Sequence, residues 1–427
     1  MKKLFLFCFL LGMAPFLWAD NPFTIHNVSA SLVLDDESGV DYLIIINGIT
    51  NDTEIEYNDK TYTSINWYKF SNPTFSISNQ PELLPDSETG YILEVDGVRK
   101  TLWVLDYEDY VLNPAVVSLN LASPADSLSC ELTSFELSGF DNLVIRYQDA
   151  SGSEHRLDRE FTMEYTTLVW GENSWNQEVV EEVVNLTSNV FDVPTSLERT
   201  SFKFSGDQYA QLMGIQIPFV EFNDEEVQPV GIASHITHET VTRDALNEVD
   251  GPKDADQVEG SGELEINFNC NSSDPDMNLS FPVWSIYKDN STTPLITRSV
   301  HEHRHRFVES GVYKVALQLS NMQGCVVTDS VIVRVTESLL RVPNAFSPNG
   351  DGINDEFRVA YRSLETFQCR VYNNWGKLVY EWSDPAQGWD GRINGREAAP
   401  AAYFYVIRAR GSDGVKYELK GDINLFR

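Results

Sequence analysis

The sequence predicts an all-β protein, built from tandem β-sandwich modules behind a cleavable signal peptide. Apolar and polar residues alternate in short runs bounded by Gly, Pro, Asn and Asp, which is typical of half-buried strands. No long amphipathic helical pattern appears. The chain has 427 residues, of which 42% are hydrophobic and 12% aromatic, so it can build several cores of roughly 100–150 residues each.

The N-terminal residues have the three-part pattern of a secretory signal peptide. Lys2 and Lys3 precede an apolar run over residues 4–18, which ends at Ala19. The run is shorter than the ~20 residues of a membrane span, and Pro15 interrupts it. We therefore expect cleavage after Ala19 and no transmembrane segment in the mature chain.

The charge is strongly acidic and unevenly distributed. The formal net charge is -33, and residues 340–427 hold 12 basic and 11 acidic residues. Residues 20–339 therefore hold 17 basic and 53 acidic residues, a net charge of -36. Such a body repels nucleic acid and anionic lipid, so neither is an expected partner. Its acidity serves solubility or attracts cations such as calcium, and the near-neutral tail indicates a separate module.

The strand-like runs group into modules. They include residues 28–34, 42–46, 61–68, 91–95 and 102–105. We expect two β-sandwich modules, over residues 20–121 and 130–230. Residues 176–186 are rich in Glu and Val and fit either a short helix or a polar strand. Residues 237–262 are acidic and Gly-rich, which predicts a linker.

A third module is expected over residues 263–337. It contains a central Trp284 strand, a Gly-x-Tyr-x-Val-x-Leu run over 311–317 and a closing run VIVRV over 331–335. It resembles the polycystic-kidney-disease (PKD) type of immunoglobulin-like domain, which implies a β-sandwich. The Gly-Asp-Gly that usually follows the Trp strand is replaced by Lys288-Asp289-Asn290.

The tail carries the most specific motifs of the chain. They are PNAFSPNGDGINDEF (343–357), VYNNWGKLVY (371–380), GWDG (388–391), YFYVI (403–407) and KGDINLFR (420–427). Over residues 340–427 the chain resembles the gliding-motility-associated C-terminal domain, the type B sorting domain of type IX secretion. Asn374 stands where that family often has Arg, and Ala402 where it usually has Gly.

The resemblance implies an exported cell-surface or extracellular protein of a Bacteroidetes-type host. Its implied partners are the type IX secretion translocon and the outer-membrane adaptor of that system. The resemblance does not indicate what the remaining modules do.

Two motifs suggest metal binding. His301 and His305 match the zinc-protease pattern H-E-x-x-H, which needs a helix, whereas a strand would place them ~13 Å apart. His303 and His305, two apart, are the remaining metal pair, and a polar strand face is the alternative.

The loop at 349–356 resembles a calcium site with Asp351, Asn354 and Asp355 as ligands, or else a turn held by Asx hydrogen bonds.

Four cysteines remain after cleavage, and none has C-x-x-C spacing. Related PKD-like modules carry a Cys at the positions of Cys270 and Cys325, so the resemblance implies a disulfide between them. The alternative is two buried free thiols. Cys130 and Cys369 lie in different modules and are expected to be unpaired.

Ser127 and Ser330 each follow an Asp and precede an aliphatic residue. This resembles the protein O-glycosylation sequon of Bacteroidetes, so both are candidate glycosylation sites.

Three functions remain open at this stage. The first is a structural or adhesive surface protein without catalytic residues. The second is a carbohydrate- or protein-binding receptor, for which aromatic side chains would supply stacking faces: Trp67, Tyr68, Trp103, Tyr107, Tyr110, Trp170 and Trp175. The third is a secreted hydrolase, which would require a deep pocket with a perturbed acid or base.

Overall fold

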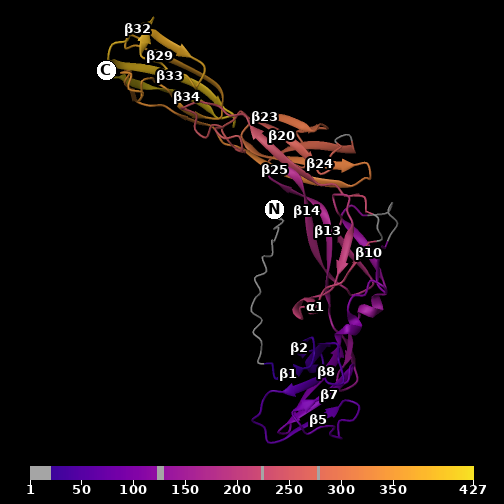
Figure 1. Cartoon of the computed structure of the whole chain (residues 1–427). Coiled ribbons are helices and arrows are strands. Elements are labelled where there is room, and N and C mark those ends of the chain that lie inside the picture. Colours follow the sequence, from indigo (N-terminus) through magenta and orange to yellow (C-terminus); the bar gives the residue numbers. More distant parts are fainter. Residues whose placement is uncertain (1–20, 123–128, 223–225, 277–278) are drawn as a thin grey trace. The chain divides into compact units, whose positions relative to one another are not determined.

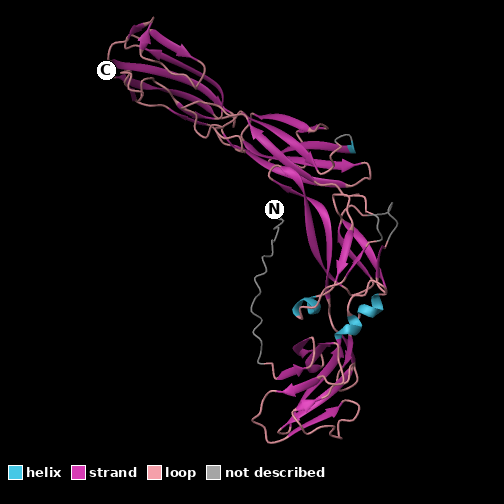
Figure 2. Ribbon diagram, viewed as in Figure 1, coloured by secondary structure: helices cyan, strands magenta, loops and turns pink. Residues whose placement is uncertain are grey.

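The computed structural model describes residues 21–122, 129–222, 226–276 and 279–427. Strands dominate the chain, and the α-helix α1 (Gln208–Leu212) is five residues long (Figures 1 and 2). Within the described ranges, no helix has the length and apolarity to cross a membrane. The predicted signal peptide, residues 1–19, lies outside them. The chain divides into two compact units, one of Met1–Thr167 with Gln177–Gln228 and the other of Leu168–Asn176 with Pro229–Arg427.

The first module has a five-stranded sheet, β2-β3-β8-β7-β5, and a three-stranded sheet, β1-β4-β6. A 3-10 helix, η1 (Tyr107–Tyr110), follows β8. The strands are β1 (Phe23–His26), β2 (Ala30–Glu37), β3 (Val40–Asn47), β4 (Glu54–Tyr57), β5 (Ile65–Lys69), β6 (Glu82–Leu83), β7 (Thr89–Val95) and β8 (Val98–Asp106).

Strand β3 is buried on both faces, which explains its unbroken apolar run. Ile44 and Ile46 pack into the core between the two sheets. Leu43 and Ile45 face the opposite way, into a second core with Ile145 and other side chains from beyond residue 140. The first module therefore shares a core with the sequence that follows it.

The second module packs the sheets β15-β10-β9 and β14-β13-β16-β17 around one core. Residues 176–185 fall in strand β14, which favours the strand alternative. The module's elements are β9 (Ser118–Leu121), β10 (Leu132–Ser138), η3 (Phe140–Leu143), β11 (Arg146–Gln148), β12 (Glu154–Arg156), β13 (Glu160–Gly171), β14 (Ser174–Asn185), β15 (Val190–Pro194), β16 (Phe202–Ser205), α1 and β17 (Phe219–Glu221).

The third module is a sandwich of the sheets β18-β20-β23 and β19-β25-β24-β21-β22. Trp284, as expected from its strand, is fully buried in the core between them. The strands are β18 (Ser234–Thr240), β19 (Glu259–Gly260), β20 (Leu264–Ser272), β21 (Ser280–Lys288), β22 (Ile296–Arg298), β23 (Glu302–Phe307), β24 (Gly311–Asn321) and β25 (Val326–Val335).

Residues 237–262 were predicted to form a linker, but both ends of this segment lie in strands. Strand β18 pairs antiparallel with β20 over seven residues, and β19 pairs with β25. These strands depend on main-chain hydrogen bonds to distant partners, so a sequence poor in apolar residues can still form them.

The C-terminal module is a sandwich built on the sheet β27-β34-β33-β29-β30. Asn394 and Gly395 both have positive φ, 50° and 78°, and form the tight turn that the Asn-Gly pair predicts between β31 and β32. The strands are β26 (Leu339–Arg341), β27 (Ala345–Phe346), β28 (Ala360–Arg362), β29 (Leu364–Tyr372), β30 (Leu378–Trp382), β31 (Arg392–Ile393), β32 (Arg396–Glu397), β33 (Ala401–Gly411) and β34 (Lys416–Leu425).

Candidate functional site

The loop between β27 and β28 is held by its own carboxylates. The Asp355 oxygens accept hydrogen bonds from the backbone N–H groups of Gly350 (2.7 Å) and Gly352 (2.8 Å). The Asp351 oxygens accept from the N–H of Ile353 (2.8 Å) and from the Asn349 side-chain amide (2.9 Å). The backbone N–H donors lower the pKa of Asp355 below its usual value. These are Asx-type bonds, which favour the turn alternative.

The calcium site stays a prediction. Calcium takes six to eight oxygen ligands, and each carboxylate oxygen of Asp351 and Asp355 already accepts one hydrogen bond from an N–H group. Among the described residues, no cluster of three or more His, Cys, Asp or Glu side chains is placed to hold a metal. Asp351, Asn354 and Asp355 do share one loop, as the sequence predicts.

We expect Asp355→Ala to lower the melting temperature of the mature chain, because two N–H groups lose their acceptor. The pKa of Asp355 is lowered in the folded state. Its contribution is therefore complete above the unfolded pKa of about 3.9 and is lost as the pH falls through the lower folded pKa. Scanning calorimetry at pH 7 and pH 3 measures both effects. A rise in melting temperature in millimolar calcium that Asp351→Ala abolishes would contradict the turn and restore the calcium site.

Several aromatic residues of the tail motifs, among them Phe346, Trp389 and Tyr403, belong to the core of the C-terminal module. Trp389 is fully buried, and its Nε1–H donates to the Arg392 carbonyl oxygen at 2.8 Å. Its ring packs against those of Phe346 and Tyr403. Trp375, in the turn between β29 and β30, is 87% exposed, and Phe404 and Phe426 are also exposed.

His301, His303 and His305 lie on or beside strand β23, not on a helix. This placement contradicts a zinc-protease site at His301 and His305. The rings of His303 and His305 are 5.8 Å apart, and burial lowers the pKa of both. His303 is 7% exposed, and its Nε2 has no hydrogen-bond partner beside the Trp284 ring. Burial therefore disfavours the charged form of this imidazole.

The predicted disulfide between Cys270 and Cys325 is wrong. Cys270 is a buried free thiol on β20, and burial raises its pKa to about 11. Cys325 is disulfide-bonded, and so is Cys130, which was expected to be unpaired. Cys369 is a buried free thiol. Cys270 and Cys325 both face the core of the third module, but a shared core does not by itself bring two sulfur atoms into bonding range.

Three of the seven aromatic residues considered as stacking faces are buried core residues, and the other four are partly buried. Trp67, Trp103 and Tyr107 are buried. Tyr68 is covered by the Arg99 guanidinium, 4.9 Å from its ring centre. Tyr110 is half-buried.

Trp170 and Trp175 sit at the tip of the β13–β14 hairpin. Their rings meet edge to face, and Trp170 stacks on His235 of β18 at 4.5 Å. The Nε1–H of Trp175 donates to the Asn271 carbonyl oxygen. The pair is therefore packed against the third module and does not form a flat exposed platform.

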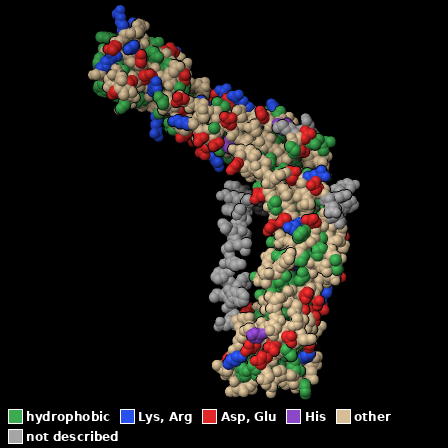
Figure 3. All heavy atoms as spheres, in the orientation of Figure 1, with side chains coloured by type: hydrophobic (Ala, Val, Ile, Leu, Met, Phe, Trp, Pro, Cys, Tyr) green, Lys and Arg blue, Asp and Glu red, His purple; other side chains and the backbone are tan. Residues whose placement is uncertain are grey.

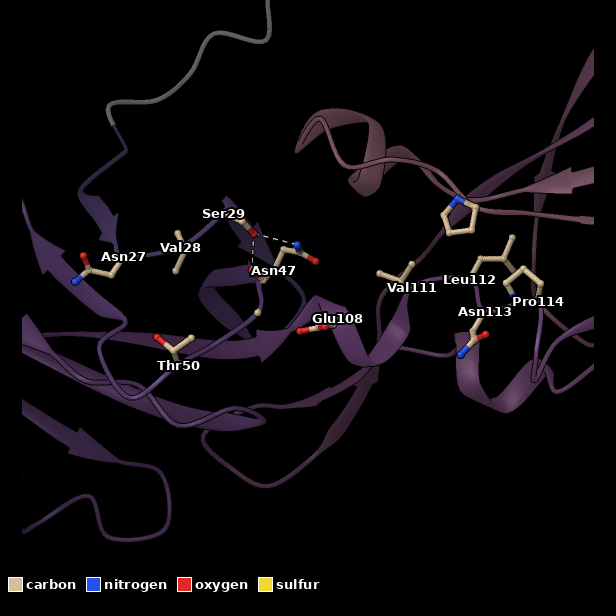
Figure 4. A pocket seen from close by; sticks show the side chains of 12 residues that line it. Asn27, Val28, Ser29, Asn47, Thr50, Glu108, Val111, Leu112, Asn113 and Pro114 are labelled. Atoms are coloured by element: carbon tan, nitrogen blue, oxygen red, sulfur yellow. Dashed lines mark hydrogen bonds between the residues drawn. The ribbon is translucent and has the colours of Figure 1, made fainter.

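A pocket of about 720 Å³ lies in the first unit (Figure 4). Ser29 and Asn47 hydrogen-bond to each other at its wall. Its lining mixes amide, hydroxyl and carboxylate groups with aliphatic side chains from Asn27, Val28, Ser29, Asn47, Gly48, Thr50, Glu108, Val111, Leu112, Asn113, Pro114 and Pro218. No aromatic side chain lines it.

The two candidate glycosylation serines differ in what the structure shows. Ser330 is exposed on β25, and its backbone N–H donates to the Asp329 carboxylate at 2.7 Å. Ser127 lies outside the described residues.

The structure reveals a buried ionic network that the sequence does not indicate. Arg159 forms an ion pair with Asp207, and the two side chains are 3% and 0% exposed. The Tyr107 hydroxyl donates to Asp207 at 2.5 Å, and the Arg159 guanidinium donates to the Leu143 and Tyr110 carbonyl oxygens. Burial, followed by the Asp207 charge, raises the pKa of Tyr107. A sequence signal is lacking because Arg159 and Asp207 are 48 residues apart.

A second unanticipated feature is the strap, residues 241–262, which contacts the C-terminal module. The Asn247 side-chain amide donates to the carbonyl oxygens of Val359 (2.7 Å) and Pro385 (2.8 Å). The Val249 N–H donates to the Tyr361 carbonyl oxygen, and the Arg362 guanidinium pairs with Asp250 at 2.6 Å. The strap therefore joins the third module to the C-terminal one through both main chain and side chains.

Comparison with known protein families gives two matches. Residues 340–425 match the type IX secretion signal domain, and residues 123–221 match a fibronectin type III domain. A search of curated proteins found no match.

Similar solved structures include the following three, each 10% identical to this chain. Latent PorU from Porphyromonas gingivalis matches over 76% of this chain, which spans 35% of that protein, with a TM-score of 0.16. The tetra-tandem repeat in the extending region of a large adhesion protein matches over 90% of this chain and 98% of its own, with a TM-score of 0.17. The FN1-FN3 domains of chicken CNTN1 match over 70% and 96%, with a TM-score of 0.19.

The C-terminal match confirms the resemblance of the tail motifs and the export they imply. The chain is a nearly all-β protein exported to the cell surface or the extracellular space, with a type IX secretion signal domain at residues 340–425 and a fibronectin type III domain at residues 123–221.

Proposed function

We propose that this protein is a non-catalytic surface protein whose β-modules act as spacers and adhesive contact surfaces outside the cell. The observation that supports this most directly is that large aromatic side chains are buried inside the modules. Trp67, Trp284 and Trp389 each fill the core of a different module. Such cores make stable modules, and contacts with other surfaces are left to their exposed strands and loops.

Binding of a glycan or peptide is the second candidate function, and the pocket in the first unit favours it. Asn27, Asn47, Asn113 and Glu108 would supply hydrogen-bond donors and acceptors for hydroxyl or amide groups. Binding of a soluble glycan by the purified chain, lost in Glu108→Ala, would favour this function over adhesion.

Deleting residues 340–427 should leave the acidic body in the periplasm, because the secretion signal domain lies in that segment. Host cells with this deletion should also lose the surface attachment that the full chain provides. Immunoblots of periplasmic and surface fractions, with an attachment assay on the same cells, measure both.

A fusion of residues 229–427 to a carrier, behind the same leader, serves as the complementary test. It retains the strap and should deliver the carrier to the surface. Surface delivery of the deletion variant would refute the role of the tail. Unchanged attachment despite failed delivery would refute the adhesive role alone.

A further inference from the structure

The five-stranded sheet of the C-terminal module has one face in the core and one in solvent. Along β33, Tyr403 and Ile407 point into the core, whereas Phe404 and Val406 are 48% and 38% exposed on the other face. Side chains of a strand alternate between faces, so residues paired with Phe404 and Val406 share their face. Within the described part of the chain, no element covers this outer face.

An apolar strip crosses the outer face over three neighbouring strands. Tyr372 of β29 lies opposite Phe404 of β33 on one side and opposite Leu378 of β30 on the other. Trp375, in the turn that joins β29 and β30, is 87% exposed. We define the apolar strip as Tyr372, Trp375, Leu378, Phe404 and Val406.

The strip has a basic border at its end near Val406. Val406 lies between Arg370 of β29 and Lys420 of β34, and Arg408 follows on the same face. Arg370 is paired with Glu381, whereas no ion pair of Arg408 or Lys420 is found among the described residues. Blue and red side chains both appear on the visible face of this module in Figure 3.

We propose that the apolar strip and its basic border are the surface by which a protein component of the type IX secretion system recognises this chain. The inference rests on the proposed export role of residues 340–427 and names the contact surface within them. The partner would present an apolar ridge flanked by carboxylates.

Three features favour this surface over the rest of the module. A secretion signal must be bound by a receptor, and the inner sheet face is filled by the module's own core. The strap occupies Val359, Tyr361 and Pro385. Exposed apolar side chains that are contiguous, not scattered, mark interaction sites, and unpaired basic residues beside them complement an acidic partner.

The charge pattern favours a protein over a lipid surface. Asp422 lies opposite Phe404 and Glu418 opposite Arg408, so carboxylates are interspersed on this face. The net charge of -36 over residues 20–339 also repels anionic lipid.

The test uses the full chain in a host with type IX secretion, carrying Phe404→Asp, Arg408→Glu or Val415→Asp. Val415 is 46% exposed in the β33–β34 turn, outside the strip, and serves as the matched control. Loss of one central contact should lower the surface-to-periplasm ratio by about tenfold for Phe404→Asp. Arg408→Glu should act in the same direction, and Val415→Asp should behave as the wild type. Melting curves of the purified chains establish that each variant is folded.

Normal export of folded Phe404→Asp and Arg408→Glu chains would overturn the contact surface. If the chain without residues 340–427 is not exported, these residues keep their role as the secretion signal. If that shortened chain is exported normally, residues 340–427 are not the secretion signal. Wild-type binding to protein-free phosphatidylglycerol vesicles that Phe404→Asp abolishes would assign the strip to lipid instead. A dimer in sedimentation that Phe404→Asp dissociates would assign it to a second copy of the chain.

Discussion

Asp207→Ala should lower the free energy of unfolding of the first unit by about 3–5 kcal/mol. The substitution leaves the Arg159 guanidinium charged, 3% exposed and without its carboxylate. It also removes the acceptor of the Tyr107 hydroxyl and the N-cap of α1, where Asp207 accepts from the Ala210 N–H at 3.1 Å. Urea unfolding of the mature chain, followed by tryptophan fluorescence and hydrogen exchange of residues 143–165, measures the change.

Two comparison variants separate the buried charge from a general effect of substitution. Glu226→Ala removes the partner of Arg199 in an ion pair whose side chains are 51% and 59% exposed, and should cost only about 0–1 kcal/mol. The double replacement Arg159→Met with Asp207→Leu removes both charges and should recover the part of the loss that comes from the unpaired buried charge, but not the Tyr107 acceptor or the N-cap. A cost below about 1 kcal/mol for Asp207→Ala would mean that water or a shifted backbone solvates Arg159.

Asn247→Ala should destabilise the C-terminal module by about 2 kcal/mol. One side-chain amide donates to two carbonyl oxygens of that module, and each such hydrogen bond contributes about 1 kcal/mol. The neighbouring substitution Leu246→Ala is the control, because Leu246 is 82% exposed and should be almost neutral. Differential scanning calorimetry of the mature chain resolves the transition.

The same reasoning predicts that residues 340–427 alone melt below the fragment 229–427. The isolated segment lacks the strap and its hydrogen bonds to Val359, Tyr361 and Pro385. Equal melting temperatures of the two fragments would contradict this prediction. If Asn247→Ala were also as neutral as Leu246→Ala, the strap would not stabilise the module.

Regions where local pattern decides structure were predictable. On β24, Tyr313, Val315 and Leu317 are buried at every second position, because side chains of a strand alternate between its two faces. Asn394-Gly395 formed its turn because both residues tolerate positive φ. In the tail, the order of the motifs was enough to identify the secretion signal domain.

The features that were missed depend on distant residues. Strand β18 has few apolar residues and exists because β20 supplies partners for its backbone. The cysteine pairing was wrong because a resemblance places two residues in one core without fixing their sulfur-to-sulfur distance.

By itself, the sequence determined the all-β class, the strand alternation of the modules and the export signal at the C-terminus. Each of these depends on a pattern of residues that are close together in the chain. Tertiary structure decided the shared core of β3, the Arg159–Asp207 pair, the strap on the C-terminal module and the exposure of the strip around Phe404. These depend on which distant surfaces meet. Burial, which sets the cost of a charge and the value of an apolar contact, is a property of that packing and not of local pattern.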